Sequence, residues 1–111
     1  MRIDLPKGTL TIPANALYSI VYNALMESYG LVGTQPTGFM SQIFGREEER
    51  GIKITEEDDN TIVVDLYIVL EYGVRIPVTV KNIQENVYHH LKKEAGCRDV
   101  KVHVHVVGIK F

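Results

Sequence analysis

The segment from Thr61 to Glu71 constrains the fold most, because apolar side chains occupy every second position along it. This period of two is typical of a β-strand, whose successive side chains point to opposite faces of the sheet. One face of the predicted strand is wholly aliphatic and comprises Ile62, Val64, Leu66, Ile68 and Leu70. A second layer of structure must bury this face.

A β-hairpin is predicted to lead into this strand. Residues Ile52 to Thr55 alternate in the same way, and the polar run Glu56 to Asn60 separates them from Thr61. Alternating runs joined by a short polar segment are typical of antiparallel strands. A shorter alternation at Gly8 to Ile12 predicts a further strand that opens the fold.

Two long helices are predicted from proline positions and helical spacing. Proline is preorganised for the first turn of a helix, so Pro13 and Pro77 predict helix starts, while Gly30 and Gly96 predict the ends. The apolar stripe of the first helix comprises Leu17, Ile20, Val21, Ala24 and Leu25. The stripe of the second comprises Ile76, Val80, Ile83, Val87 and Leu91. Each helix therefore has one face for the sheet.

A last strand is predicted at residues 99–107, where valines at 100, 102, 104 and 106 form one apolar face. A strand, a long helix and another strand in succession usually form a right-handed crossover. Strands 61–71 and 99–107 are therefore expected to be parallel neighbours.

Residues 33–50 carry weaker signals. Pro36 and Gly38 indicate a turn, and one or two apolar helical turns are predicted from Phe39, Met40, Ile43 and Phe44. We interpret this cluster as a satellite of the core, and a partner-docking surface is the alternative.

The predicted fold class is α+β, a two-layer sandwich with two long helices on one face of a small mixed sheet. The predicted order is β-α-(short α)-β-β-α-β. At 111 residues and 12.5 kDa, the chain fits a single domain, residues 1–111, with a core of ordinary size.

The charge and cysteine content restrict the environment and partners. A formal charge of −2 provides no broad field for nucleic acid or an anionic membrane surface. No stretch approaches the roughly 18 apolar residues of a membrane span, so no direct membrane insertion is expected. Cys97 is the single cysteine, which fits a reducing compartment. A cytoplasmic location is therefore predicted.

The second face of the predicted sheet is the candidate partner surface. It presents polar and aromatic side chains, Asp65, Tyr67, His103 and His105, among apolar ones, Val63, Val69, Val107 and Ile109. A half-apolar face that contains an aromatic residue is a candidate association site. The alternative is that segment 33–50 folds across this face and leaves only ordinary packing.

Catalytic and metal chemistry finds little support in the sequence. No nucleophile elbow, phosphate loop or dinucleotide-binding glycine pattern occurs, and Cys97 has no evident base, so no enzyme and no cofactor are predicted. His103 and His105 share a strand face at a spacing that suits a metal ion. The further ligands, Asp65 or the pair His89 and His90, cannot be placed beside them from sequence, and no metal site is predicted.

An RNA-binding module is the alternative function. The run Gly30-Leu31-Val32-Gly33 is similar to the Gly-x-x-Gly clamp of the KH module. Its middle residues are apolar rather than basic, so a helix stop followed by a turn is the favoured interpretation.

The block Asp65-Leu66-Tyr67-Ile68-Val69-Leu70-Glu71-Tyr72-Gly73-Val74-Arg75-Ile76-Pro77 closely resembles the central block of the alkaline shock protein family, also called the Gls general-stress family. The resemblance continues through residues 83–87 and 102–108, and residues 8–13 are similar to the family's beginning. His103 and Val107 depart from it, because asparagine and a polar residue are more typical there.

The resemblance implies a bacterial protein linked to stress and envelope maintenance, with no established catalytic residues. It implies action through a protein partner, which for some members is an integral membrane protein that holds them at the inner membrane. We therefore expect a non-catalytic interaction or scaffold protein. The sequence leaves open whether the chain forms a homo-oligomer.

Overall fold

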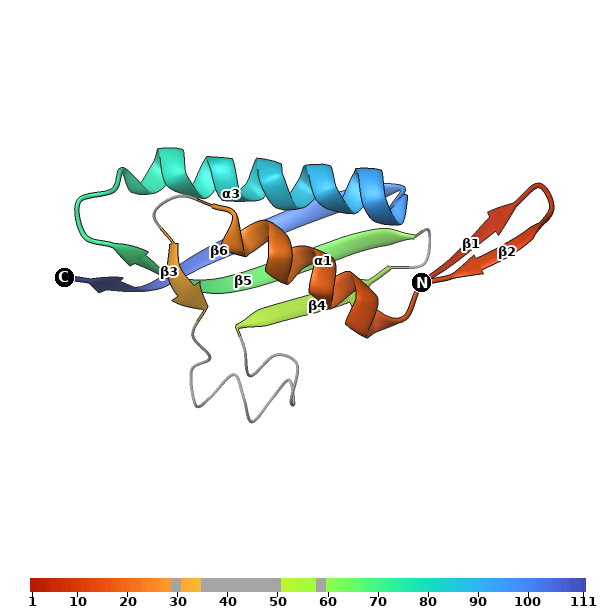
Figure 1. Cartoon of the computed structure of the whole chain (residues 1–111), viewed down its shortest axis with the longest axis horizontal. Helices are drawn as coiled ribbons and strands as arrows, with labels where there is room; N and C mark the ends of the chain where they lie inside the picture. Colours follow the sequence, from red (N-terminus) through yellow and green to blue (C-terminus); the bar gives the residue numbers. More distant parts are fainter. Residues whose placement is uncertain (29–30, 35–50, 58–59) are drawn as a thin grey trace.

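Two helices cover one face of a mixed β-sheet in the computed structural model, which describes residues 1–28, 31–34, 51–57 and 60–111 (Figure 1). The central strand is β5 (Thr61–Glu71). Along one edge it pairs in parallel with β6 (Asp99–Lys110). Along the other edge it pairs antiparallel with β3 (Leu31–Thr34) and then β4 (Ile52–Glu56). The predicted α+β class and the hairpin of β4 and β5 are confirmed.

The aliphatic face of β5 lies at the centre of the core, as its alternation predicts. Its five members are all 0% exposed: Ile62, Val64, Leu66, Ile68 and Leu70. Paired strands on both edges of β5 satisfy its backbone groups. The neighbouring strands thereby supply hydrogen-bond partners along both edges of this buried strand.

The two helices start and stop near the predicted residues. Helix α1 (Ala14–Met26) follows Pro13, and α3 (Ile76–His90) carries Pro77 in its first turn. A π-helical turn, Leu91–Ala95, extends α3, and Gly96 ends it in the left-handed conformation with φ of 70°. Glycine adopts this conformation without the steric cost that a side chain would impose.

The helices pack side by side on the sheet, with α1 against β3 and β4 and α3 against β6 (Figure 1). Fully buried residues of their stripes are Leu17, Val21, Ala24, Leu25, Ile83, Val87 and Leu91. Two predicted members of the α3 stripe are not fully buried: Ile76 is 42% exposed, and Val80 is only partly buried. Ile76 stands at the start of α3, close to the turn from β5, where the helix has only begun to cover the sheet.

Strand β6 returns parallel to β5 through α3, which confirms the predicted crossover. Its alternation breaks at Val107: Val106 is opposite Ile68, whereas Gly108 is already opposite Val69. Val107 is therefore an extra residue, a β-bulge. One extra residue moves every later side chain to the other face. Ile109 consequently lies opposite Leu70 and not on the second face, so that part of the prediction is wrong.

The N-terminal region also differs from the prediction. Strands β1 (Arg2–Leu5) and β2 (Gly8–Thr11) pair with each other in a separate two-stranded hairpin, which projects beyond one end of the main sheet (Figure 1). The predicted opening strand therefore exists but belongs to a different sheet. The strand β3 was not predicted, because its four residues are too few to establish an alternation.

Within segment 33–50 the structure describes only positions 33 and 34. The predictions for the rest of the segment therefore lie outside the described residues. These are the turn at Pro36 and Gly38, the apolar cluster of Phe39, Met40, Ile43 and Phe44, and the alternative that this segment covers the second sheet face.

Neither α1 nor α3, nor any other helix in the described ranges, has the length and apolar composition needed to span a bilayer.

Candidate functional site

The face of the main sheet opposite the helices, called the outer face below, gathers the four candidate site residues. It is formed by Val63, Asp65, Tyr67 and Val69 of β5 and by Lys101, His103 and His105 of β6. The parallel register places Asp65 beside His103 and Tyr67 beside His105. Both helices pack on the other face, and no element of the described ranges lies across this one.

His105 is held between two neighbours on β5. Its Nε2 lies 3.3 Å from Oδ1 of Asp65, and its ring stacks on Tyr67 with centroids 4.7 Å apart and planes 14° from parallel. The His105 side chain is 46% exposed, whereas the Asp65 side chain is 21% exposed. His103 is exposed and makes no hydrogen bond or ion pair within the described residues. The cluster therefore has an ordered part, Asp65–His105–Tyr67, and one free imidazole.

The hydroxyl of Tyr67 is a hydrogen-bond donor at neutral pH. Partial burial raises the pKa of Tyr67 above its ordinary value of 10.0, and the negative charge of Asp65 raises it further. A neutral phenol beside a carboxylate and an imidazole, set among Val63 and Val69, offers a partner both apolar area and hydrogen-bonding groups.

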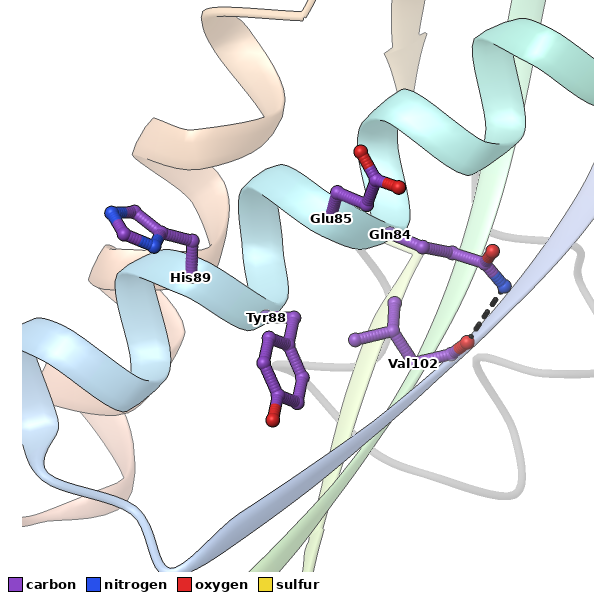
Figure 2. Close-up of a pocket in the computed structure, with 5 residues that line it drawn as sticks. All are labelled: Gln84, Glu85, Tyr88, His89 and Val102. Carbon is purple, nitrogen blue, oxygen red and sulfur yellow. Dashed lines mark hydrogen bonds between the residues drawn. The ribbon is translucent and has the colours of Figure 1, made fainter.

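A second surface feature is an open groove between α3 and β6 (Figure 2), with a volume of about 630 Å³. Gln84 reaches from α3 to β6, and its Nε2 donates to the backbone oxygen of Val102 at 3.0 Å. Tyr88 extends from the same helix and is 42% exposed. Sequence reasoning missed Gln84 and Tyr88 as a set, because only the tertiary structure brings α3 beside the edge of β6.

A third feature is a histidine that joins the two helices. His90 near the end of α3 contacts Glu94 through Nδ1, and its Nε2 lies 3.3 Å from Oε2 of Glu27, just past the end of α1. The hydrogen bond to Glu94 raises the pKa of His90 above its ordinary value of 6.5; partial burial opposes this rise, and the charge of Glu27 adds to it. The neighbouring titratable ring is His89, 6.2 Å away.

We predict that protonated His90 stabilises the helix pair and that alkaline pH removes this contribution. The folded-state pKa is raised, so the contribution is complete below pH 6.5 and is lost as pH rises through the raised value. A proton NMR titration should show that Glu94→Gln lowers the His90 pKa. Glu85→Gln is the control, because Glu85 makes no ion pair within the described residues. A wild-type His90 that titrates at 6.5 would contradict the bridge.

The described residues contain no cluster of side chains suited to holding a metal ion. No three His, Cys, Asp or Glu side chains within these ranges converge on a point where a metal ion could bind. His103 and His105 lie on the outer face, whereas His89 and His90 belong to α3 on the opposite side of the sheet. Burial raises the pKa of the Cys97 thiol, which therefore stays protonated and is a poor nucleophile.

The Gly-x-x-Gly segment adopts a strand where it is described. Leu31, Val32 and Gly33 belong to β3, with Gly33 opposite Val69 of β5. The Gly-x-x-Gly clamp of the KH module is a loop, so the described part of this segment does not have the clamp's conformation. The predicted turn at Gly33 is likewise wrong, and Gly30 lies outside the described residues.

Comparison with known proteins extends the resemblance to almost the whole chain. A model of the alkaline shock protein 23 family, described as having a cell envelope-related function, matches residues 3–111. The uncharacterized protein Spy1614 of Streptococcus pyogenes serotype M6 is 29% identical over 115 residues, which cover 99% of this chain and 94% of that protein. No solved structure matches the chain.

Two uncharacterized proteins of Bacillus subtilis (strain 168) are also similar. YqhY is 30% identical over 111 residues, covering 97% of this chain and 82% of YqhY. YloU is 25% identical over 108 residues, covering 93% of this chain and 89% of YloU. The similarity thus extends over both helices and the main sheet and is not confined to one motif.

Proposed function

The chain belongs to the alkaline shock protein 23 family, whose function is cell envelope-related, and on that premise we propose that it is a non-catalytic scaffold protein. Its partners are proteins of the bacterial cell envelope, and its site of action is the cytoplasmic side of the inner membrane. An integral membrane protein is the partner that would hold it there.

One observation carries this proposal: the outer face is ordered, half apolar and uncovered by any described element. Tyr67 and Val69 provide apolar area, and the Asp65–His105 pair provides fixed polar groups. Association surfaces between proteins combine these properties, with aromatic residues enriched at their centres. A stress-linked scaffold needs such a surface and does not need an active site.

The proposed partner surface can be tested by a charge substitution at its centre. The full-length chain serves as bait in native lysate, with soluble and membrane fractions analysed separately. Tyr67→Glu puts a second negative charge beside Asp65, so it should abolish capture of envelope proteins while the thermal midpoint stays nearly unchanged.

Tyr22→Glu is the matched control, because Tyr22 is a partly exposed tyrosine on α1, away from the outer face. It should leave capture intact. Equal capture by both variants would show that the partner surface lies elsewhere. If Tyr67→Glu unfolds the isolated monomer, the outer face is internal core and not a binding surface.

A further inference from the structure

Exposed apolar side chains gather at one end of the molecule, where β5 turns into α3 and where β6 finishes (Figure 1). This group is called the end patch below and comprises Tyr72, Ile76, Val78, Ile109 and Phe111. The most exposed members are Tyr72 at 68%, Val78 at 54% and Phe111 at 92%. Single exposed apolar side chains are ordinary, whereas a group of them indicates a surface that associates with a partner.

Ring contacts and shared hollows join these side chains into one surface. The rings of Tyr72 and Phe111 lie against each other, with centroids 4.8 Å apart. Ile76 and Ile109 line a hollow of about 430 Å³ together with both aromatic residues. Val78 and Tyr72 line a second hollow, of about 500 Å³. Because Tyr72 belongs to both hollows, the end patch is continuous across this end of the molecule.

The charged side chains around the end patch are mostly positive. Arg75 directly precedes α3, Lys81 lies in its second turn, and Lys110 is the last residue of β6. All three are exposed, and none makes an ion pair within the described residues. Among the described residues that line the two hollows, Glu71 alone carries a carboxylate side chain. This end of a chain with a formal charge of −2 therefore has an excess of positive side chains, which favours an anionic partner.

We propose that the end patch contacts a lipid surface with anionic headgroups. A tyrosine with an exposed ring and aliphatic neighbours is suited to the boundary between membrane and water, where its ring is buried and its hydroxyl stays hydrated. Each lysine or arginine near such a surface gains from the negative headgroups. The cell envelope-related function of the family is in keeping with a membrane as the partner.

The position of the end patch favours a lipid surface over a second protein. The molecule measures 52 × 30 × 18 Å, and the patch lies at one end of its long axis (Figure 1). A stable protein–protein interface buries about 800 Å² on each partner, which a broad side of the molecule provides better than a narrow end. A lipid contact can be weaker, because stable membrane anchoring combines two separate signals.

The lipid contact goes beyond the proposed scaffold function and does not depend on it. The end patch belongs to a turn and to the ends of α3 and β6, so side chains reach the headgroup layer while no helix or strand enters the bilayer. The outer face extends along the sheet and stays accessible to a protein. The lipid contact and an integral membrane protein would then be the two signals that hold the chain at the membrane.

Sedimentation of the purified full chain with lipid vesicles tests the contact in the absence of any partner protein. Vesicles of phosphatidylglycerol and phosphatidylcholine in equal parts should pellet a measurable fraction of the wild-type chain at low ionic strength, and vesicles of phosphatidylcholine alone should pellet less. Added salt should weaken the binding, because it screens the attraction between the cations and the headgroups. A wild-type chain that stays in the supernatant with the anionic vesicles overturns the proposal and assigns the end patch to a protein partner.

Two pairs of substitutions locate the contact on the molecule. Tyr72→Asp puts a negative charge in place of an apolar ring, so it should lower the vesicle partition coefficient by more than about 10-fold. Arg75→Gln removes one positive charge and should lower it by about 5-fold. Tyr88→Asp and Lys93→Gln are the matched controls, because both residues are exposed beyond the middle of α3 and should hardly affect binding. Equal binding within the tyrosine pair overturns the proposal; if Tyr72→Asp lowers the thermal midpoint, equal binding within the cation pair does so instead.

Discussion

Replacing Leu66 with alanine is expected to lower the free energy of unfolding by about 2 to 5 kcal/mol. Leu66 is 0% exposed at the middle of β5, opposite Ile52 on β4 and Val104 on β6. Because both neighbouring strands are hydrogen-bonded to β5, the surroundings have little freedom to collapse into the space that the smaller side chain leaves. Ile83→Ala should cost a similar amount, since Ile83 is buried on the helix side of the same core.

Urea unfolding monitored by circular dichroism measures this effect. The midpoint should fall while the slope of the unfolding free energy against urea stays the same. Val107→Ala is the control: Val107 is 41% exposed at the bulge, so its truncation should change the stability by less than about 0.5 kcal/mol. A Leu66→Ala midpoint close to wild type would show that the aliphatic face of β5 is not the core.

The second large effect is expected from Ala24→Leu, which should cost about 2 to 4 kcal/mol. Ala24 is 1% exposed where α1 meets α3, and its backbone oxygen accepts from Nδ2 of Asn86 at 2.8 Å. A leucine at this position needs room that the two helices do not leave. It would push α3 away from α1 and break the hydrogen bond across the helix pair.

The effect is measured by thermal and urea unfolding, with Ala14→Leu as the control. Comparing the two variants separates steric crowding between the helices from the effect of leucine on helix propensity. Ala14 is exposed in the first turn of α1, so a leucine there should change the stability by no more than about 0.5 kcal/mol. Equal stability of the two variants would contradict close packing of α1 against α3. A double substitution that also shortens Asn86 to alanine should recover part of the loss, because it removes atoms from the same contact.

Much of the candidate site could be predicted from the sequence. The alternation along β5 and β6 assigned Asp65, Tyr67, His103 and His105 to one face, and the structure places all four there. The alternation could not predict which of the two imidazoles, His103 or His105, contacts the carboxylate of Asp65. That depends on the register between two strands separated by the whole of α3. Among the described residues, this register gives His105 two partners and His103 none.

By itself, the sequence determined the features that short-range chemistry controls. A period of two or 3.6 residues, the fixed backbone angle of proline and the left-handed freedom of glycine act within a few residues. They were sufficient for α1, α3 and β5, for the helix starts at Pro13 and Pro77, and for the end at Gly96.

Only the tertiary structure decided the features that depend on distant pairings. A strand as short as β3 is stable only because β5 offers its edge, and the bulge at Val107 is defined only by the strand that it opposes. The bridge from His90 to Glu27 and the bond from Gln84 to Val102 likewise join residues far apart in the chain. Such contacts leave no period in the sequence, because their energy comes from which elements meet in space.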